Sequence, residues 1–438
     1  RDLVRSRGLG DVYKRQEVEI LTLEDCLRIG IDNNLSLEGK RKEIQKSKYG
    51  VSENRSKLLP QINAIAGYNN NFDPPVSVTD GSSYGVPYNI TKTLQHSANA
   101  GLEMQMPLFN QTLYTSMSIA KVMEEISRLS YGKAREDVIL QISKMYYLGQ
   151  VTAEQIMLIK ANIIRLEELR DITQAFFDNG MSMEVDLKRV NINLENLKVQ
   201  YDNAQAMMKQ QLNMLKYIMD YPAEKEIALT PVNTDSITTV ALTGLSENIY
   251  ELQLSQSQVQ LAERQKKIIT NGYIPSLSLT GSWRYAAYTD KGYHWFHSGP
   301  SNQWFRSYGV GLTLRIPIFD GLDKTYKIKK AMIDIENKRL AWEDARKNLQ
   351  TQYLNAVNDL MNNQRNFKKQ KDNYLLAEDV YAVTSDRYRE GIASMTEVLQ
   401  DEMQMSEAQN NYISAHYNYR VTNLMLLKLT GQIESLVK

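Results

Sequence analysis

Few residues in this 438-residue chain are of the types that perform catalysis or hold metal ions, since it has only four histidines and one cysteine. His294 and His297 have the spacing of metal ligands, but they lie in a Tyr- and Trp-rich stretch without a third ligand nearby. Zinc sites in proteins use three or four protein ligands, so we expect an aromatic surface loop there and no metal. Cys26 falls on the apolar side of a predicted first helix, where we expect a buried structural thiol.

Motifs for other kinds of chemistry are missing from the sequence as well. It contains no glycine-rich phosphate-binding loop, nucleophile elbow or paired catalytic carboxylates. Charged residues make up 24% of the chain and nearly cancel, giving a net charge of +1, whereas nucleic-acid binding needs a basic stripe. We therefore predict a protein that is not an enzyme, has no cofactor and binds no nucleic acid.

Three charged residues, Glu103, Arg284 and Arg315, lie within segments in which apolar and polar residues alternate. Such alternation is typical of β-strands with two different faces. A soluble antiparallel sheet with one solvated face alternates in the same way, so the pattern by itself leaves that alternative open. The length of the segments suits tilted membrane-spanning strands of about 9–11 residues. The four predicted strands are residues 61–72, 97–108, 275–286 and 307–318.

Two features favour strands that cross a membrane. The charged residues lie on the polar faces, where a water-filled lumen would tolerate them, and the long loops 73–95 and 289–306 are rich in aromatic residues, as expected near a membrane interface. No apolar run approaches the ~18 residues of a membrane-spanning helix. Four strands cannot close a barrel, and open edges cannot face lipid. Two chains would give about eight strands with a filled interior, and three would give about twelve strands around a lumen.

Two long stretches of the chain, 108–221 and 318–438, contain none of its ten prolines and predict long helices. Their apolar residues recur at the three-, four- and seven-residue spacings that are typical of coiled coils. Gly180 and Gly391 interrupt the two stretches, and glycine accepts the positive φ of a tight turn. Each stretch therefore predicts a long helical hairpin, and neighbouring hairpins must pack side by side to bury their apolar residues.

The same order of elements occurs twice, which indicates an internal repeat. The string MPLFN at 106–110 recurs as IPIFD at 316–320. Each copy predicts a helix (23–58 or 246–270), then two strands, then a long helical hairpin. We place repeat 1 at residues 17–221, an irregular equatorial linker at 222–245 and repeat 2 at 246–438.

The first sixteen residues, RDLVRSRGLGDVYKRQ, differ from the rest of the chain. They lack the apolar core and the small-residue cleavage site of a signal peptide, and they resemble translated adaptor sequence. We therefore expect residues 1–16 to be foreign to the protein and its export signal to be missing from this sequence.

The repeated order, the two junction strings and the tip motifs FFDNGMSMEVDL (176–187) and YREGIASMTEVL (388–399) resemble the TolC-like outer membrane efflux proteins. The resemblance extends over residues 21–438. It implies an α+β membrane protein with four transmembrane β-strands per chain, in which a homotrimer forms a β-barrel in the outer membrane and an α-barrel duct through the periplasm. The implied partners are outer-membrane lipid, a periplasmic adaptor (membrane fusion) protein and an inner-membrane RND or ABC transporter.

The resemblance also implies a gate at the closed tip. Relatives have a latch whose positions correspond to Asp186 and Tyr388, but the arginine that completes it in well-known members is replaced by Ala393. Two rings of aspartate narrow the entrance of relatives, and here those positions are Glu397 and Gln400, so that one ring keeps its charge. The implied adaptor-docking tips are Gly180, Met181, Ser182, Gly391, Ile392 and Ala393.

Our first hypothesis is therefore an outer-membrane exit duct that serves a tripartite drug-efflux pump or a type I secretion system. The alternative is a soluble coiled-coil scaffold that binds partner proteins through its helices. That alternative explains the helices, but it does not explain four lumen-type strands at matched places in the two repeats.

Overall fold

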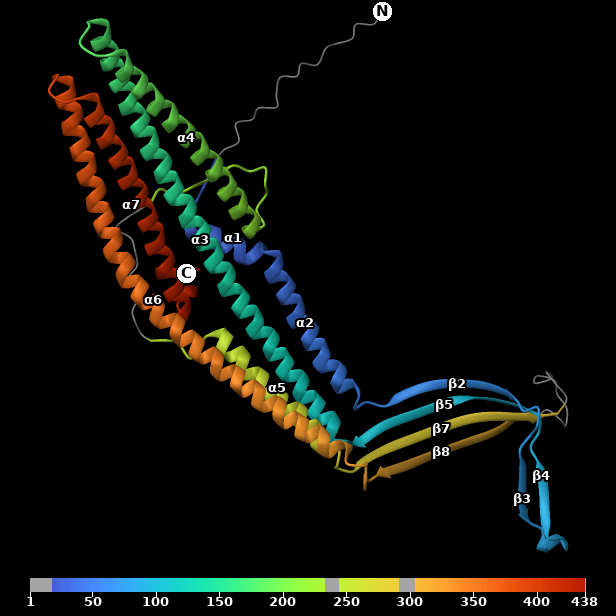
Figure 1. Ribbon diagram of the computed structural model, residues 1–438. Helices are drawn as coiled ribbons and strands as arrows, with labels where there is room; N and C mark the ends of the chain where they lie inside the picture. The colour runs from blue at the N-terminus through green and yellow to red at the C-terminus, as the bar shows by residue number, and fades with distance from the viewer. Residues whose placement is uncertain (1–17, 233–243, 291–303, 438) are drawn as a thin grey trace, which may run out of the picture. The chain divides into compact units, whose positions relative to one another are not determined.

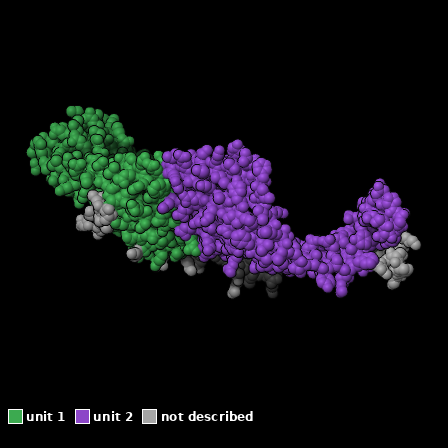
Figure 2. All heavy atoms as spheres, turned by 90° about the horizontal axis from the view of Figure 1, so that it is seen from below, with its two compact units in different colours: residues 1–43, 128–255, 341–438 green, residues 44–127, 256–340 purple. Residues whose placement is uncertain are grey.

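Both halves of the chain contribute to two compact units, which Figure 2 shows in green and purple. Unit 1 contains residues 1–43, 128–255 and 341–438, and unit 2 contains residues 44–127 and 256–340. His294 and His297, for which we predicted an aromatic loop, lie outside the described residues. The computed structural model describes residues 18–232, 244–290 and 304–437.

Unit 2 contains an antiparallel sheet with the strand order β2-β5-β7-β8 (Figure 1). The two strands of each repeat thus join one sheet, and the four predicted strands are confirmed. The last strand ends three residues earlier than predicted, because Pro317 has no backbone N–H to donate to a ladder. The observed bounds are Gln61–Asn70 for β2, His96–Phe109 for β5, Ser276–Thr289 for β7 and Trp304–Arg315 for β8.

The register of the sheet gathers the apolar side chains on one face. Leu279 pairs with Met106 on one side and Leu312 on the other, and residues opposite one another in an antiparallel pair point to the same face. Glu103 and Arg284 fall on the other face, where they form an ion pair. The two faces inferred from the alternation are therefore confirmed. In the described part of the chain, β2 and β8 each have one edge without a neighbouring strand.

The predicted loop 73–95 contains a second hairpin, formed by β3 (Val76–Asp80) and β4 (Tyr88–Lys92). A tight turn allows this pairing: Gly85 has a φ of +70°, which favours glycine. A Cβ on Gly81 would lie 2.7 Å from the carbonyl oxygen of Val86, so the backbone approaches too closely there for any other residue. The turn glycines, rather than apolar periodicity, are the signal that identifies this hairpin.

The predicted first helix is two helices, α1 (Leu23–Asn33) and α2 (Leu35–Ser56). They separate at Asn34, whose side-chain oxygen accepts a hydrogen bond from the Leu37 backbone N–H at 3.1 Å. The Asn34 amide also donates to the carbonyl oxygen of Ile218 at 2.7 Å. Asparagine therefore begins a new helix here, because its side chain satisfies a free N–H group at the helix start.

The linker predicted to be irregular contributes one short strand. β6 (Ile227–Leu229) pairs in parallel with β1 (Glu19–Leu21) near the start of the chain. α5 follows at Tyr250–Asn271 and begins the second repeat. Both strands belong to unit 1, so the sheet ties the linker to the first repeat.

Two long helical hairpins provide most of unit 1, and their tips lie at the same end of it (Figure 1). Apolar residues at coiled-coil spacing form the core between them, including Leu166, Leu169, Leu194, Val398 and Met405, each at most 1% exposed. The long hairpins and their packing are thus confirmed. The first hairpin is α3 (Gln111–Asp178) with α4 (Glu184–Met219), and the second is α6 (Asp323–Arg389) with α7 (Met395–Leu429), followed by the 3-10 helix η2 (Ile433–Val437).

Substituting Gly101 by alanine tests the close packing of β5 against β7. An added Cβ would lie 2.4 Å from the carbonyl oxygen of Trp283 and 2.8 Å from the Cα of Arg284. Because these are backbone atoms, we expect Gly101→Ala to lower the free energy of unfolding by about 1–3 kcal/mol. Thermal unfolding in detergent micelles, followed by circular dichroism, measures this loss. Gly309→Ala on β8 is the matched control, because nothing lies within 4 Å of its Cβ position; equal loss in both variants would contradict the packing.

Candidate functional site

Both hairpin tips turn in the same way. Gly180 and Gly391 have φ values of +73° and +74°, in the left-handed region that favours glycine. The backbone N–H of the residue after each glycine donates to a carbonyl oxygen in the last turn of the preceding helix. Met181 donates to the Phe176 carbonyl and Ile392 to the Arg387 carbonyl, both at 2.8 Å. This Schellman geometry satisfies the last carbonyl groups of α3 and α6, and it gives the two repeats equivalent tips.

The tip residues predicted to dock an adaptor present an apolar surface. Met181 is 70% exposed and Ile392 is 62% exposed. Met183, which the sequence analysis did not single out, is 71% exposed beside them. Ser182 and Ala393 are half-buried, and the Ser182 hydroxyl has no hydrogen-bond partner among the described residues. Exposed apolar residues gathered at one place are typical of interaction surfaces.

Arg189 connects the two tips of one chain. Its Nη1 donates to Asp186 Oδ1 at 3.2 Å and to Thr396 Oγ1 at 3.4 Å. Asp186 and Arg189 lie in the first turns of α4, whereas Thr396 lies in the first turn of α7. Sequence reasoning missed Arg189 because it is not at the position where relatives have the latch arginine. It nevertheless supplies a cation beside Asp186, which Ala393 cannot.

Tyr388 lies inside the tip rather than on its surface. It is 6% exposed, its hydroxyl donates to Thr173 Oγ1 at 3.3 Å, and its ring centroid lies 5.7 Å from that of Phe176. Within the described part of a single chain, Tyr388 bonds to Thr173 and Asp186 bonds to Arg189. A direct bond between these two residues stays a prediction.

Glu397 stabilises the start of α7. Ser394 is the N-cap, and its hydroxyl accepts a hydrogen bond from the Glu397 N–H at 3.3 Å. The same hydroxyl donates to Glu397 Oε1 at 3.1 Å. A carboxylate in the first turn of a helix is also favoured by the helix dipole. Gln400 is exposed one turn later. A role for Glu397 and Gln400 at an entrance remains a prediction.

Polar contacts join α3 to the second hairpin below the tips. Arg165 forms an ion pair with Glu378 of α6, and Asn162 donates to Gln409 of α7 at 2.7 Å. Both Asn162 and Gln409 are at least 96% buried, so each bond is needed to satisfy a polar group out of water. The sequence signal for such contacts is a polar residue at a position where the coiled-coil spacing calls for an apolar one.

Glu402 is a buried carboxyl group at such a position, between Val398 and Met405 in α7. It is 4% exposed, and its Oε1 has no hydrogen-bond partner among the described residues. Burial raises the pKa of Glu402 from 4.5 to about 7. Burial also raises the pKa of Tyr381, to about 12, and the negative charge of Glu402 adds to that rise. The core below the tip therefore contains a carboxyl group that changes charge near neutral pH.

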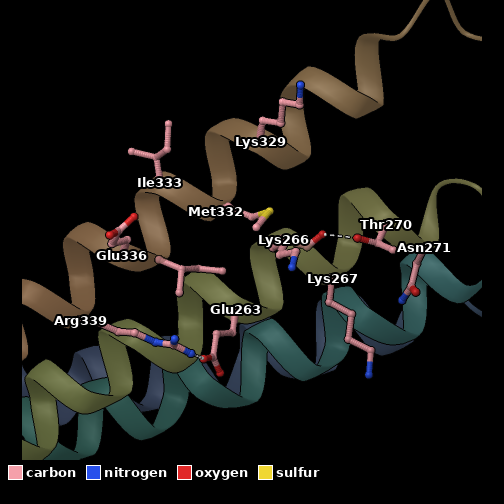
Figure 3. Close-up of a pocket in the computed structure, with 11 residues that line it drawn as sticks. Glu263, Lys266, Lys267, Thr270, Asn271, Lys329, Met332, Ile333, Glu336 and Arg339 are labelled. Atoms are coloured by element: carbon pink, nitrogen blue, oxygen red, sulfur yellow. Dashed lines mark hydrogen bonds and ion pairs between the residues drawn. The ribbon is translucent and has the colours of Figure 1, made fainter.

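Unit 2 has a groove of about 960 Å³ between α5 and α6 (Figure 3). Lys267 and Lys329 point away from each other in this view, so the basic groups of the groove do not converge on one point. Met332 and Ile333 of α6 are 53% and 59% exposed. Exposed apolar side chains along a groove suit the packing of another helix better than the binding of a small ion.

Clusters of metal-ligating side chains and the single thiol, Cys26, are the groups that metal or thiol chemistry would need. No group of three or more His, Cys, Asp or Glu residues among them could hold a metal ion. Cys26 is fully buried, and burial raises the pKa of its thiol to about 12. A thiol that stays protonated is a poor nucleophile. The helices that the structure describes include none that is long and apolar enough to cross a membrane.

Comparison with known families finds a match to each repeat. Residues 29–219 and residues 241–432 both match the family described as "Outer membrane efflux protein". The curated relatives include the outer membrane protein TolC of Vibrio cholerae, 21% identical over 87% of this chain and 84% of the relative. They also include a probable efflux pump outer membrane protein, TtgC, of Pseudomonas putida, 23% identical over 82% of this chain and 75% of the relative.

Solved structures show the same fold. The outer-membrane channel OprN superposes with a TM-score of 0.76 at 15% identity, covering 93% of this chain and 89% of that one. CusC gives a TM-score of 0.77 at 16% identity, with 93% and 91% covered. The MtrE outer membrane channel of Neisseria gonorrhoeae gives 0.74 at 19% identity, with 93% and 88% covered.

Glu402→Gln tests the buried carboxyl group, because glutamine keeps an oxygen acceptor and cannot titrate. Because the pKa of Glu402 is higher in the folded protein than in the unfolded chain, protonation of Glu402 favours the folded state. This contribution to the free energy of unfolding is complete below about pH 4.5 and is lost as the pH rises through 7. At pH 8 we expect the variant to be more stable than the parent, by on the order of 2–3 kcal/mol. The difference should vanish at pH 4.5.

Guanidinium unfolding at the two pH values, followed by circular dichroism, measures this effect. Glu407→Gln is the control, since Glu407 lies on the same helix and is exposed. A pH dependence that is the same in the parent and in Glu402→Gln would show that another group titrates.

Proposed function

The chain belongs to the outer membrane efflux protein family, and we propose that three copies of it form the exit duct of a tripartite pump. It is an outer-membrane efflux channel and not an enzyme. The soluble scaffold that the sequence left open is excluded by this membership. The observation that supports the trimer most strongly is a sheet with one apolar face, one polar face and two edges that no strand of the described chain pairs with.

Unpaired edges explain why a single chain is incomplete. In lipid, each backbone N–H or C=O group without a partner costs several kcal/mol. Pairing β8 of one copy with β2 of the next removes both edges. Three copies give about twelve strands, enough to leave an open lumen, whereas two copies give about eight strands with a filled interior.

Small residues on the polar face favour the wider assembly. Gly67, Gly101, Gly309 and Gly311 all lie on that face by the register of the sheet. No side chain projects from these positions into the enclosed space. A filled interior would need larger side chains at such places, so the face supports three copies over two.

The helices carry apolar residues that also need a partner. Met332 and Ile333 in the α5–α6 groove, and Leu340 on the same helix, are each more than half exposed. A helix of a neighbouring copy that packs along α6 would bury these side chains. Because α6 follows β8 directly in the chain, one neighbouring copy could both pair with the free edge of β8 and cover the exposed face of α6.

A periplasmic adaptor is the proposed partner of the tips, and an inner-membrane transporter is the proposed source of substrate. Met181, Met183 and Ile392 offer the adaptor an apolar surface, in which the two methionines are flexible. The name of the Pseudomonas putida relative places that protein in an efflux pump. By analogy we favour an efflux pump over a type I secretion system for this chain, with an RND or ABC transporter as the inner-membrane partner.

The gate of the duct is proposed to be the contact between the two tips. Arg189, held between Asp186 and Thr396, ties α4 to α7 within each chain. Asp186 also remains the proposed partner of Tyr388 in the latch, and Glu397 the proposed charged ring at the entrance. Opening would separate the tips, so the adaptor must bind the separated form more tightly than the closed form.

Asp186→Asn tests this gate without a change in size, because it weakens the bond within α4 that holds Arg189 toward Thr396 of α7. Arg189 is about half exposed, so we expect the loss of its anchor at Asp186 to weaken the contact between the tips by about 0.5 kcal/mol in each copy. Three copies together contribute about 1.5 kcal/mol, and we expect the open probability to rise about tenfold. Single-channel recording in planar bilayers measures it.

Glu184→Gln is the matched control, since it removes a charge from the same helical turn, and the ion pair of Glu184 is with the exposed Lys188 of α4. An unchanged open probability for Asp186→Asn, or an equal rise for both variants, would refute the gate at Arg189. Glu397→Gln in the same assay reports on the entrance ring through the block by divalent cations.

A further inference from the structure

The polar face of the sheet has a charge that nothing in the described structure balances. Three charged residues fall on this face in the described strands: Glu103 on β5, Arg284 on β7 and Arg315 on β8. All the other residues of the face are uncharged, such as the Ser278–Thr313 pair. The charge of the face is therefore decided by how these three residues pair.

Glu103 and Arg284 neutralise each other. Arg284 Nη2 donates to Glu103 Oε1 between neighbouring strands. Gly101 lies opposite Arg284 in the ladder, where a Cβ would lie 3.2 Å from the Cβ of Arg284. The missing side chain at this position gives the guanidinium room to lie over β5. The pair thus contributes no net charge to the face.

Arg315 is left as the positive charge. It is exposed, pairs with Ser276 in the ladder and ends β8 next to the residues that lead into α6. Within the described part of the chain, it forms no ion pair with any carboxylate. Its nearest neighbours on the same face of β8 are Thr313 and Gly311, which cannot offset its charge.

We propose that Arg315 makes the lumen of the duct selective for anionic solutes. The inference rests on the proposed trimer, in which three copies of Arg315 form a ring at the end of the barrel nearest the helices. A ring of arginine in a narrow passage favours anions, because its walls of low dielectric constant strengthen the field of the charges. The solutes that the ring favours carry carboxylate, phosphate or other negative groups.

The ring and the tip act on opposite charges. Glu397 at the tip is proposed to interact with cations, whereas Arg315 is proposed to act on anions at the end of β8. When the tip is closed, it limits the current; when it is open, the Arg315 ring becomes the stronger filter. Selectivity for anions should therefore increase in the variant with the opened tip, Asp186→Asn.

Reversal potentials in a potassium chloride gradient test the ring. In planar bilayers we expect Arg315→Gln to lower the permeability ratio of chloride to potassium by about twofold or more. Arg315→Lys keeps the charge and should keep the ratio, and Arg315→Glu should reverse the preference. All variants are measured in the Asp186→Asn background.

Arg306→Gln is the matched control. It removes the same charge from the same strand, but Arg306 lies opposite Tyr285 on the apolar face of the sheet. We expect its permeability ratio to equal that of the parent. An unchanged ratio for Arg315→Gln, or an equal decrease for Arg306→Gln, would overturn the proposal. Failure of the parent to form any conducting pore would instead overturn the proposed trimeric duct.

Discussion

The unpaired backbone of two strand edges is the constraint on which the rest of the structure depends. β2 and β8 each have one edge with no neighbour in the described sheet, and lipid offers no hydrogen bonds to replace one. In the proposed trimer, a strand of another copy lies beside each edge. The polar faces of the three copies would then enclose a common space, and the exposed apolar residues of α6 would pack against the next copy.

The sequence predicted the elements whose signals are local. Alternation, clear in three segments and weaker in residues 61–72, identified four strands and both faces of the sheet, because the side-chain period of a strand is fixed at two. Glycine at 180 and 391 located both hairpin tips, because only glycine takes a positive φ readily. The β3–β4 hairpin and the break at Asn34 depend on turns and side-chain caps. These signals span only a few residues and were missed among longer patterns.

The partners of the tip residues could not be predicted, because they come from distant parts of the chain. Tyr388 donates to Thr173, and Arg189 reaches Thr396 across the two repeats. The positions carried over from relatives identified Asp186, but not the cation beside it. Glu402 occupies a coiled-coil core position, but the sequence analysis did not single it out. Its loss of hydration depends on the burial of α7 by other helices, among them α6, whose Tyr381 is affected by the charge of Glu402.

The central claim, closure of the sheet by three copies, is tested most directly by native mass spectrometry of the full chain released from detergent micelles. The account predicts one main species with the mass of three 50.3 kDa chains. It also predicts that a proline in the middle of β8, such as Val310→Pro, shifts that species to monomer, because proline removes a backbone donor and disrupts the edge that a neighbour must pair with. A stable monomer or dimer of the parent chain would contradict the account.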